Sequence, residues 1–134
     1  MKPCRTVLVV DDSEFVRSYH TCILRANDFE VITAVDGMDA LEKLFTSPCD
    51  AILTDINMGN MDGYDFIRRV RAEPSFKALP IIIVSTESET HDKQKGFAAG
   101  ANLYIVKPCA PDLMLEHLKM VLASPSATLS GKVL

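Results

Sequence analysis

Residues 6–13 read Thr-Val-Leu-Val-Val-Asp-Asp-Ser, an apolar run that ends abruptly in two adjacent carboxylates. A second run, residues 81–84, is equally apolar and also lacks any alternation of polar and apolar positions. Strands buried on both faces have this composition, as in a parallel sheet that is covered by helices. The first run therefore predicts a central strand, with Asp11 and Asp12 at its carboxyl end.

Short apolar runs recur along the chain and are separated by stretches with helical periodicity. The five runs are residues 6–10, 31–34, 51–54, 81–84 and 103–106, and each is too short for an ordinary helix. The first helical stretch, residues 13–25, places Phe15, Val16, Tyr19, Cys22 and Ile23 on one face. The second has Met38, Leu41, Leu44 and Phe45, the third has Phe66, Ile67 and Val70, and the last has Met114, Leu115, Leu118, Val121 and Leu122. The fourth stretch, residues 90–99, is weak, and it predicts a marginal, mobile helix.

This alternation of strand and helix, five times over, predicts the fold class. It indicates an α/β protein with a parallel sheet and helices on both faces. Right-handed crossovers favour the flavodoxin-like (βα)5 arrangement with strand order 2-1-3-4-5. We expect one domain over residues 1–122, followed by a flexible C-terminal tail over residues 123–134, which is rich in Ser, Ala and Thr.

Composition excludes several classes of function. The net charge of −4 and the sequence pI of about 5.3 disfavour nucleic-acid binding by bulk charge. No run approaches the roughly 20 apolar residues of a membrane helix, and residues 1–4 do not begin a signal peptide. Cys4, Cys22, Cys49 and Cys109 lack zinc-ligand spacing and are interpreted as reduced, packed thiols, which predicts a cytoplasmic protein.

Polar residues follow four of the five predicted strands. Ligands of open parallel sheets bind beyond the carboxyl ends of the strands. These positions hold Asp11 and Asp12 after the first strand, Asp55 after the third, Ser85 after the fourth and Lys107 after the fifth. Three carboxylates raise one another's pKa values, and a hard divalent cation such as Mg²⁺ relieves that conflict. An ammonium group beside them suits a phosphoryl oxygen.

Each of these residues also has a purely structural interpretation. Asp12 could cap the helix that begins near Ser13, and Asp36, after the second strand, is interpreted as a turn or cap residue. The histidines, His20, His91 and His117, are placed on helices away from the site, as surface or packing residues. The combination of complementary groups at four strand ends favours a functional site over these separate structural roles.

Four motifs in this order resemble the receiver domains of two-component response regulators, most closely the stand-alone chemotaxis-regulator type. The motifs are residues 9–13, 53–63, 83–86 and 99–108, and the resemblance extends over about residues 5–122. It implies a signalling switch rather than an enzyme with an external substrate. A histidine kinase or His-phosphotransferase would supply the phosphoryl group, and chemotaxis or motility would be the process controlled.

The resemblance also implies a role for individual residues. Asp55 matches the phosphoacceptor; Asp12 and Asp55 match side-chain ligands of Mg²⁺, the backbone carbonyl of Asn57 matches a third ligand, and Asp11 matches a carboxylate that acts through metal-bound water. Lys107 matches the phosphoryl-contacting lysine, Ser85 and Tyr104 match the switch pair, and Asn57 and Glu87 match residues that tune the phosphoryl lifetime. Pro108 matches a proline after a cis peptide bond. The helix 4, strand 5 and helix 5 face is the expected surface for a downstream target.

One departure and three alternatives remain. Gly59 stands where relatives usually carry proline, which leaves the loop after Asp55 freer. The chain could instead be a receiver-like adaptor that is never phosphorylated. A flavodoxin-type FMN carrier would need a phosphate-cradling loop in place of Asp11 and Asp12. An aspartate-nucleophile phosphatase would carry its second aspartate two residues after the first, whereas these two are adjacent.

Overall fold

The order of strands and helices follows the predicted alternation along the chain. In the computed structural model, which describes residues 5–123, they are β1 (Arg5–Val10), α1 (Glu14–Ala26), β2 (Phe29–Ala34), α2 (Gly37–Thr46), β3 (Ala51–Thr54), α3 (Gly63–Ala72), the 3-10 turn η1 (Pro74–Phe76), β4 (Ile81–Ser85), α4 (Thr90–Ala99), β5 (Leu103–Val106) and α5 (Pro111–Ala123). Beyond Ala123, which ends α5, the predicted tail lies outside the described residues.

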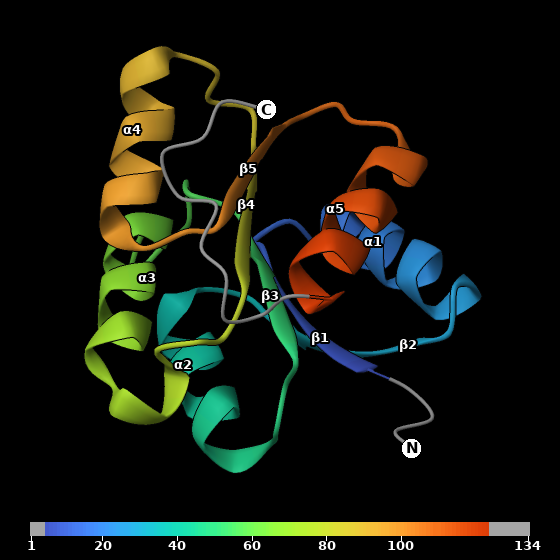
Figure 1. Cartoon of the computed structure of the whole chain (residues 1–134), viewed down its shortest axis with the longest axis horizontal. Helices are drawn as coiled ribbons and strands as arrows, with labels where there is room; N and C mark the ends of the chain where they lie inside the picture. The colour runs from blue at the N-terminus through green and yellow to red at the C-terminus, as the bar shows by residue number, and fades with distance from the viewer. Residues whose placement is uncertain (1–4, 124–134) are drawn as a thin grey trace.

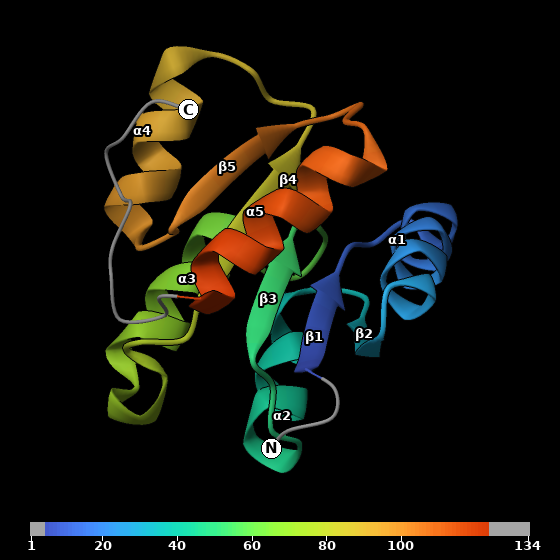
Figure 2. The ribbon, with the colours of Figure 1, turned by 45° about the vertical axis from the view of Figure 1, so that its right-hand side comes forward.

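The sheet has five parallel strands in the order β2-β1-β3-β4-β5, which confirms the predicted topology. All its strands therefore end at the same edge, as the arrowheads in Figure 2 show. Val10 at the end of β1 pairs with Thr54 at the end of β3, and Ser85 of β4 pairs with Val106 of β5. This register brings the residues that follow these strands into one row.

Helices cover both faces of the sheet, so each strand is buried on two sides. Helices α1 and α5 lie on one face, and α2, α3 and α4 lie on the other (Figure 1). Alternate residues of the central strands serve the two cores: Leu8 and Ile83 pack toward α2, α3 and α4, whereas Val9 and Ile82 pack toward α1 and α5. This arrangement explains why the strand sequences are continuously apolar.

Three helices begin at a side-chain cap. Ser13, Asp36 and Asp62 each accept a hydrogen bond from the backbone N–H three residues later, at 3.2, 2.9 and 2.9 Å. The cap role predicted for Asp36 is confirmed. Ser13, and not Asp12, caps α1, which leaves the carboxylate of Asp12 available for another role.

The predicted buried face of α1 is correct for Val16 and Ile23 and wrong for its other three residues. Phe15 is 80% exposed and Tyr19 45% exposed, and Cys22 is exposed as well, against the packed thiol that the sequence suggested. The face turned inward carries Val16, His20, Ile23 and Leu24, which are spaced as i, i+4, i+7 and i+8. Met38 and Phe45 of α2 are also exposed, whereas the predicted faces of α3 and α5 are buried as expected.

Helix α4 spans the residues that the sequence predicted, and it buries little. Its buried residues are Gly96 and Ala99. The turn η1 was not predicted from the sequence, and it begins at Pro74, a residue whose fixed φ suits the first position of a helix. Among residues 5–123, no helix combines the length and the apolar character that crossing a bilayer requires.

Candidate functional site

The row of residues beyond the strand ends forms a site at the carboxyl edge of the sheet. The backbone N–H of Asp55 donates to the carbonyl of Val10 at 3.0 Å, which continues the β1–β3 ladder by one residue. The backbone N–H of Lys107 donates in the same way to the backbone carbonyl of Ser85 at 2.7 Å. The Asp11 N–H donates to the carbonyl of Ala34 at 3.2 Å, and the three bonds fix the positions of Asp11, Asp55 and Lys107 before any side-chain contact is considered. The Lys107–Pro108 peptide bond is cis, as the resemblance implied.

The ammonium group of Lys107 lies between two carboxylates. Its Nζ is 2.9 Å from Asp11 Oδ2 and 3.3 Å from Asp55 Oδ2. Two backbone amides complete the contacts: Ser13 N–H donates to Asp11 Oδ1 at 2.9 Å, and Ile56 N–H donates to Asp55 Oδ1 at 2.7 Å. Both carboxylates are therefore held in fixed orientations by these contacts.

The acidity of these groups reflects their partial burial and their mutual repulsion. Burial raises the pKa of Asp55, and the charge of Asp11 adds to this effect, against the opposing influence of the Ile56 N–H and of Lys107. Burial alone would lower the pKa of Lys107, but its hydrogen bond to Asp11 and the charges of Asp55 and Asp11 outweigh burial and raise it. Lys107 therefore stays protonated, and its single positive charge does not fully offset the carboxylates around it.

Asp11, Asp12 and Asp55 together have the donor chemistry of a hard-cation site. One oxygen from each lies within 4.8 Å of the others, with Asp11 buried, Asp55 half-buried and Asp12 exposed. An all-oxygen set of three carboxylates, open to water on one side, fits Mg²⁺, which keeps several waters and takes few protein ligands. The residues present therefore fit the metal that the sequence predicted, while the Asn57 carbonyl ligand stays a prediction.

The other predicted residues meet at Glu87, in the loop between β4 and α4. Ser85 is fully buried, and its Oγ accepts a hydrogen bond from the Glu87 N–H at 3.1 Å. The hydroxyl of Tyr104 donates to the Glu87 carbonyl at 2.8 Å, and Asn57 Nδ2 donates to Glu87 Oε1 at 2.9 Å. Burial raises the pKa of Tyr104, so its hydroxyl remains a donor across the physiological range. The predicted switch and lifetime residues thus form one connected group.

The loop between β3 and α3 has a tether that sequence reasoning missed. Asn60 adopts a left-handed backbone with φ of 65°, and its Nδ2 donates to Asp36 Oδ2 at 2.6 Å. Hydrogen bonds from the Asp39 N–H and from Asn60 lower the pKa of Asp36. The side chain of Met61 also packs against Gly37. These contacts restrain a loop in which Gly59 alone would leave considerable freedom. The asparagine at position 60, a residue type that tolerates a left-handed backbone, was the one sequence feature that indicated this turn.

His20 lies beside the site, which corrects the prediction that the histidines are remote from it. It is 6% exposed and lines a hollow together with Val16, Tyr19, Thr86, Lys107, Pro108 and Cys109. Burial lowers the pKa of His20, and the charge of Lys107 lowers it further, against a smaller effect of Asp11. Cys109 is half-buried next to the same hollow, and burial raises its pKa. Both side chains are therefore neutral near pH 7.

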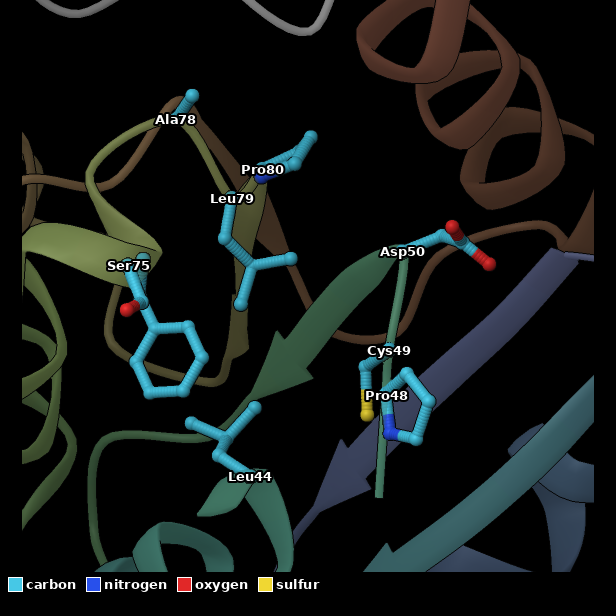
Figure 3. A pocket seen from close by; sticks show the side chains of 9 residues that line it. Leu44, Pro48, Cys49, Asp50, Ser75, Ala78, Leu79 and Pro80 are labelled. Atoms are coloured by element: carbon cyan, nitrogen blue, oxygen red, sulfur yellow. The ribbon is translucent and has the colours of Figure 1, made fainter. Parts of the chain in front are cut away.

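A second hollow lies at the opposite end of the sheet and has no part in this chemistry. It is lined by residues that precede β3 and β4 and by residues of α2 and η1: Leu44, Pro48, Cys49, Asp50, Ser75, Phe76, Ala78, Leu79 and Pro80 (Figure 3). Burial raises the pKa of Cys49 to about 11, which keeps this half-buried thiol protonated and agrees with the predicted packing role.

Fold and site together define a class of protein. It is a doubly wound α/β domain whose strand ends carry an acid cluster, a lysine bound to that cluster and a buried hydroxyl. Residues 7–119 match the response regulator receiver domain. The chain belongs to this family.

Two of the similar proteins are named as chemotaxis proteins. The chain is 38% identical to chemotaxis protein CheY1 of Helicobacter pylori over 120 residues, which cover 88% of this chain and 97% of that protein. It is 34% identical to protein PilG of Pseudomonas aeruginosa over 113 residues, or 84% of each chain. The solved structure of the chemotaxis response regulator CheY4 of Vibrio cholerae is 38% identical, with a TM-score of 0.83, and the match covers 88% of this chain and 98% of that one.

Proposed function

We propose that this chain is a phosphorylation-controlled binding switch in which Asp55 accepts a phosphoryl group in a Mg²⁺-dependent reaction. The donor is a phosphohistidine on a sensor histidine kinase or a His-phosphotransferase. The observation that carries the proposal is the placement of Lys107 Nζ between Asp11 and Asp55, at 2.9 and 3.3 Å, with Asp12 in the same cluster. This arrangement provides a nucleophile and positive charge at one point.

The proposed transfer is an in-line displacement at phosphorus. The free lone pair of an Asp55 oxygen forms the new P–O bond while the P–N bond to the donor imidazole breaks, and the nitrogen keeps that electron pair. The Ile56 N–H fixes the other carboxylate oxygen at 2.7 Å and so orients the attacking one. Lys107 turns its ammonium group toward the phosphoryl oxygens as they approach. Mg²⁺ bound at Asp11, Asp12 and Asp55 would supply further positive charge for these oxygens.

The switch would start at Ser85. A phosphoryl oxygen is a stronger acceptor than a hydroxyl, so the Ser85 O–H turns toward it and its Oγ moves away from the Glu87 N–H. Tyr104 bonds the carbonyl of the same residue and responds to the movement of Glu87. Helix α4, β5 and α5 border this region and form the proposed surface for the downstream target. The loop would thus have two alternative arrangements, and phosphorylation would shift the equilibrium between them, which is what a switch requires.

Asn57 and Glu87 are proposed to set the lifetime of the aspartyl phosphate. Their side chains are hydrogen-bonded to each other at 2.9 Å, and the Asn57 side chain is exposed. Both groups can orient a water molecule for attack on phosphorus, so the phosphorylated form is short-lived. The control of chemotaxis or motility, in the cytoplasm, is proposed from the similarity to chemotaxis protein CheY1 and to the chemotaxis response regulator CheY4.

The decisive experiment replaces Asp55 with Ala and measures labelling by a small phosphodonor in Mg²⁺ buffer. We expect labelling of the wild type and none of D55A, whose far-ultraviolet circular dichroism remains that of a folded α/β domain. The variant D65A removes an exposed carboxylate from α3, in the same aspartate-rich region, and should label normally.

The labelled wild-type protein also tests the lifetime and the alternative function. A phosphorylated form that persisted for many hours in Mg²⁺ would contradict the role of Asn57 and Glu87. Undiminished labelling of D55A would refute the phosphoacceptor assignment. A wild type that neither labels nor binds beryllofluoride would instead be the unphosphorylated adaptor.

A further inference from the structure

Helix α4 begins without a side-chain cap. Its N-cap residue, Glu89, makes no capping hydrogen bond with its side chain, in contrast to the caps of α1, α2 and α3 within the described chain. Its buried residues, Gly96 and Ala99, lie in its second half. A helix without a cap and without an apolar face near its first turn depends on other contacts to hold that turn in place.

A tyrosine of α3 supplies such a contact. Tyr64 is 5% exposed, and its hydroxyl donates to the backbone carbonyl of Asp92, in the first turn of α4, at 3.1 Å. The ammonium group of Lys95, one turn further along α4, lies 4.5 Å from the centre of the Tyr64 ring. Burial raises the pKa of Tyr64, and the charges of Asp92, Glu87 and Asp62 raise it further, so the hydroxyl stays a donor.

Tyr64 is fixed to the backbone of the phosphoacceptor on its other side. It directly follows Gly63, whose N–H donates to the carbonyl of Ile56 at 2.8 Å. Gly63 sits so closely on the Asp55 carbonyl oxygen that a Cβ at this position would overlap that oxygen. The backbone of Asp55 is therefore packed against Gly63, and the next residue, Tyr64, reaches the first turn of α4 through its hydroxyl.

A second tyrosine holds the adjoining loop from the other side. Tyr104 of β5 donates to the carbonyl of Glu87, and its ring has room because Gly96 of α4 lacks a side chain. A Cβ on Gly96 would lie 3.2 Å from the Tyr104 ring and 2.6 Å from Ile83 Cδ1. The segment 87–92 is thus held at both ends by tyrosine hydroxyls, one from β5 and one from α3.

We propose that Tyr64 is a positioning residue that couples the Asp55 backbone to the first turn of helix α4. Its hydroxyl makes the response of α4 to a filled phosphoryl site depend on α3 as well as on Ser85 and Tyr104. This coupling rests on the proposed function of Asp55, whereas the attachment of α4 by Tyr64 does not. The two statements are therefore tested by separate measurements.

The attachment is tested by amide hydrogen exchange of Tyr64→Phe without any phosphoryl mimic. This variant keeps the ring and its contact with Lys95 and removes only the hydroxyl. Loss of one neutral hydrogen bond should speed exchange in residues 88–95 by about fivefold and leave β1 and β3 unchanged. Tyr19→Phe, at an exposed position of α1, should exchange like the wild type throughout. Equal exchange of Tyr64→Phe and wild type in α4, or faster exchange across the whole sheet, would overturn the proposal.

The coupling is tested by repeating the exchange with Mg²⁺ and beryllofluoride. We expect the mimic to alter exchange in residues 88–95 of the wild type, and Tyr64→Phe to show less than half of that change. Labelling of Asp55 in Tyr64→Phe should stay within about twofold of the wild type, since Tyr64 does not contact the reacting atoms. A full wild-type response in Tyr64→Phe, or no response of α4 in a wild type that labels normally, would refute the coupling. Failure of the wild type to label would refute the proposed function instead.

Discussion

Lys107 shows how a single residue defines the electrostatics of the site. Its ammonium group contacts Asp11 and Asp55, yet the pKa of Asp55 remains raised because burial and the charge of Asp11 outweigh that contact. One positive charge is insufficient for three carboxylates whose oxygens lie within 4.8 Å of one another. This imbalance supports the proposal that the cluster binds a cation and that Lys107 meets the incoming phosphoryl group.

His20 provides a prediction at the scale of one residue. Burial lowers its pKa from the ordinary value of 6.5, so the unfolded chain binds a proton at this residue before the folded protein does. As the pH falls below about 6.5, the unfolded state is therefore favoured, and the free energy of unfolding decreases. His20→Gln removes this contribution. We expect the urea midpoint of this variant to fall less than that of the wild type between pH 7 and pH 5.

The control for this measurement is Ser18→Ala, an exposed substitution on the same helix. It should keep the wild-type dependence of the urea midpoint on pH. A His20→Gln variant with the same pH dependence as the wild type would show that this imidazole does not destabilise the folded protein on protonation.

Individual site residues were predictable wherever their position followed from a strand end. Asp11, Asp55, Ser85 and Lys107 each come directly after an apolar run or end it, and a parallel sheet must bring such positions together. His20 was missed because an imidazole was not counted among the apolar residues of α1, although it shares a face with Val16 and Leu24.

At the scale of elements, the junction between β3 and α3 contains two glycines with opposite surroundings. Gly59 has no atom of the described residues within 4 Å of an added Cβ, and its φ is not positive. At Gly63, the first residue of α3, an added Cβ would overlap the carbonyl oxygen of Asp55. The loop is therefore tolerant at its tip and tightly packed where it enters the helix.

These surroundings predict different effects of the same substitution. Gly63→Ala should lower the free energy of unfolding by about 1–3 kcal/mol or more, since the added carbon displaces the Asp55 backbone, and it should slow labelling of Asp55. Gly59→Ala should be neutral or stabilise the protein by up to about 1 kcal/mol, because it restricts the unfolded chain. Urea denaturation and labelling of both variants provide the measurement. A Gly63→Ala protein as stable as Gly59→Ala would contradict the close packing at Asp55.

The buried face of a helix was easier to predict where the helix packs fully against the sheet. The five apolar positions predicted to face inward on α5 are all buried, because α5 lies over the centre of the sheet (Figure 2). Helix α1 lies over the edge formed by β1 and β2 (Figure 2), and Phe15 and Tyr19 on this helix are exposed. An apolar residue on a partly covered helix can be exposed, so it does not by itself indicate which face is buried. The predicted face of α1 was therefore rotated from the observed one.

At the scale of the whole molecule, the strand sequences predicted a sheet with helices on both faces. The strand order did not follow from the residues and was taken from the general preference for right-handed crossovers. Continuous apolar runs required helices on both faces, which the two cores confirm. Contacts between distant segments were beyond sequence reasoning. Arg71 of α3 is one example: its guanidinium donates to the carbonyls of Gly100, Phe76 and Leu79 and to Asn102 Oδ1, which joins the start of β4 to the turn before β5.

The proposed Mg²⁺ site in the acid cluster predicts that the stability of the whole domain depends on Mg²⁺. A cation that binds the folded state alone stabilises it by about 2.7 kcal/mol at a concentration 100 times its Kd. We therefore expect the thermal midpoint of the wild type to rise with Mg²⁺. Asp12→Asn removes one ligand and one like charge from the cluster. Without the metal it should be at least as stable as the wild type, and with the metal it should gain much less.

The change in the relative stability of Asp12→Asn and the wild type on adding Mg²⁺ distinguishes a cation site from an ordinary surface cluster of carboxylates. Asp112→Asn removes an exposed carboxylate from the first turn of α5, and it should keep the full wild-type response to Mg²⁺. If Asp12→Asn gained as much from Mg²⁺ as the wild type, the metal would not be bound by this cluster. If the wild type gained nothing, repulsion among Asp11, Asp12 and Asp55 would have to be relieved by Lys107 alone, and the proposed Mg²⁺-dependent transfer would lose its physical basis.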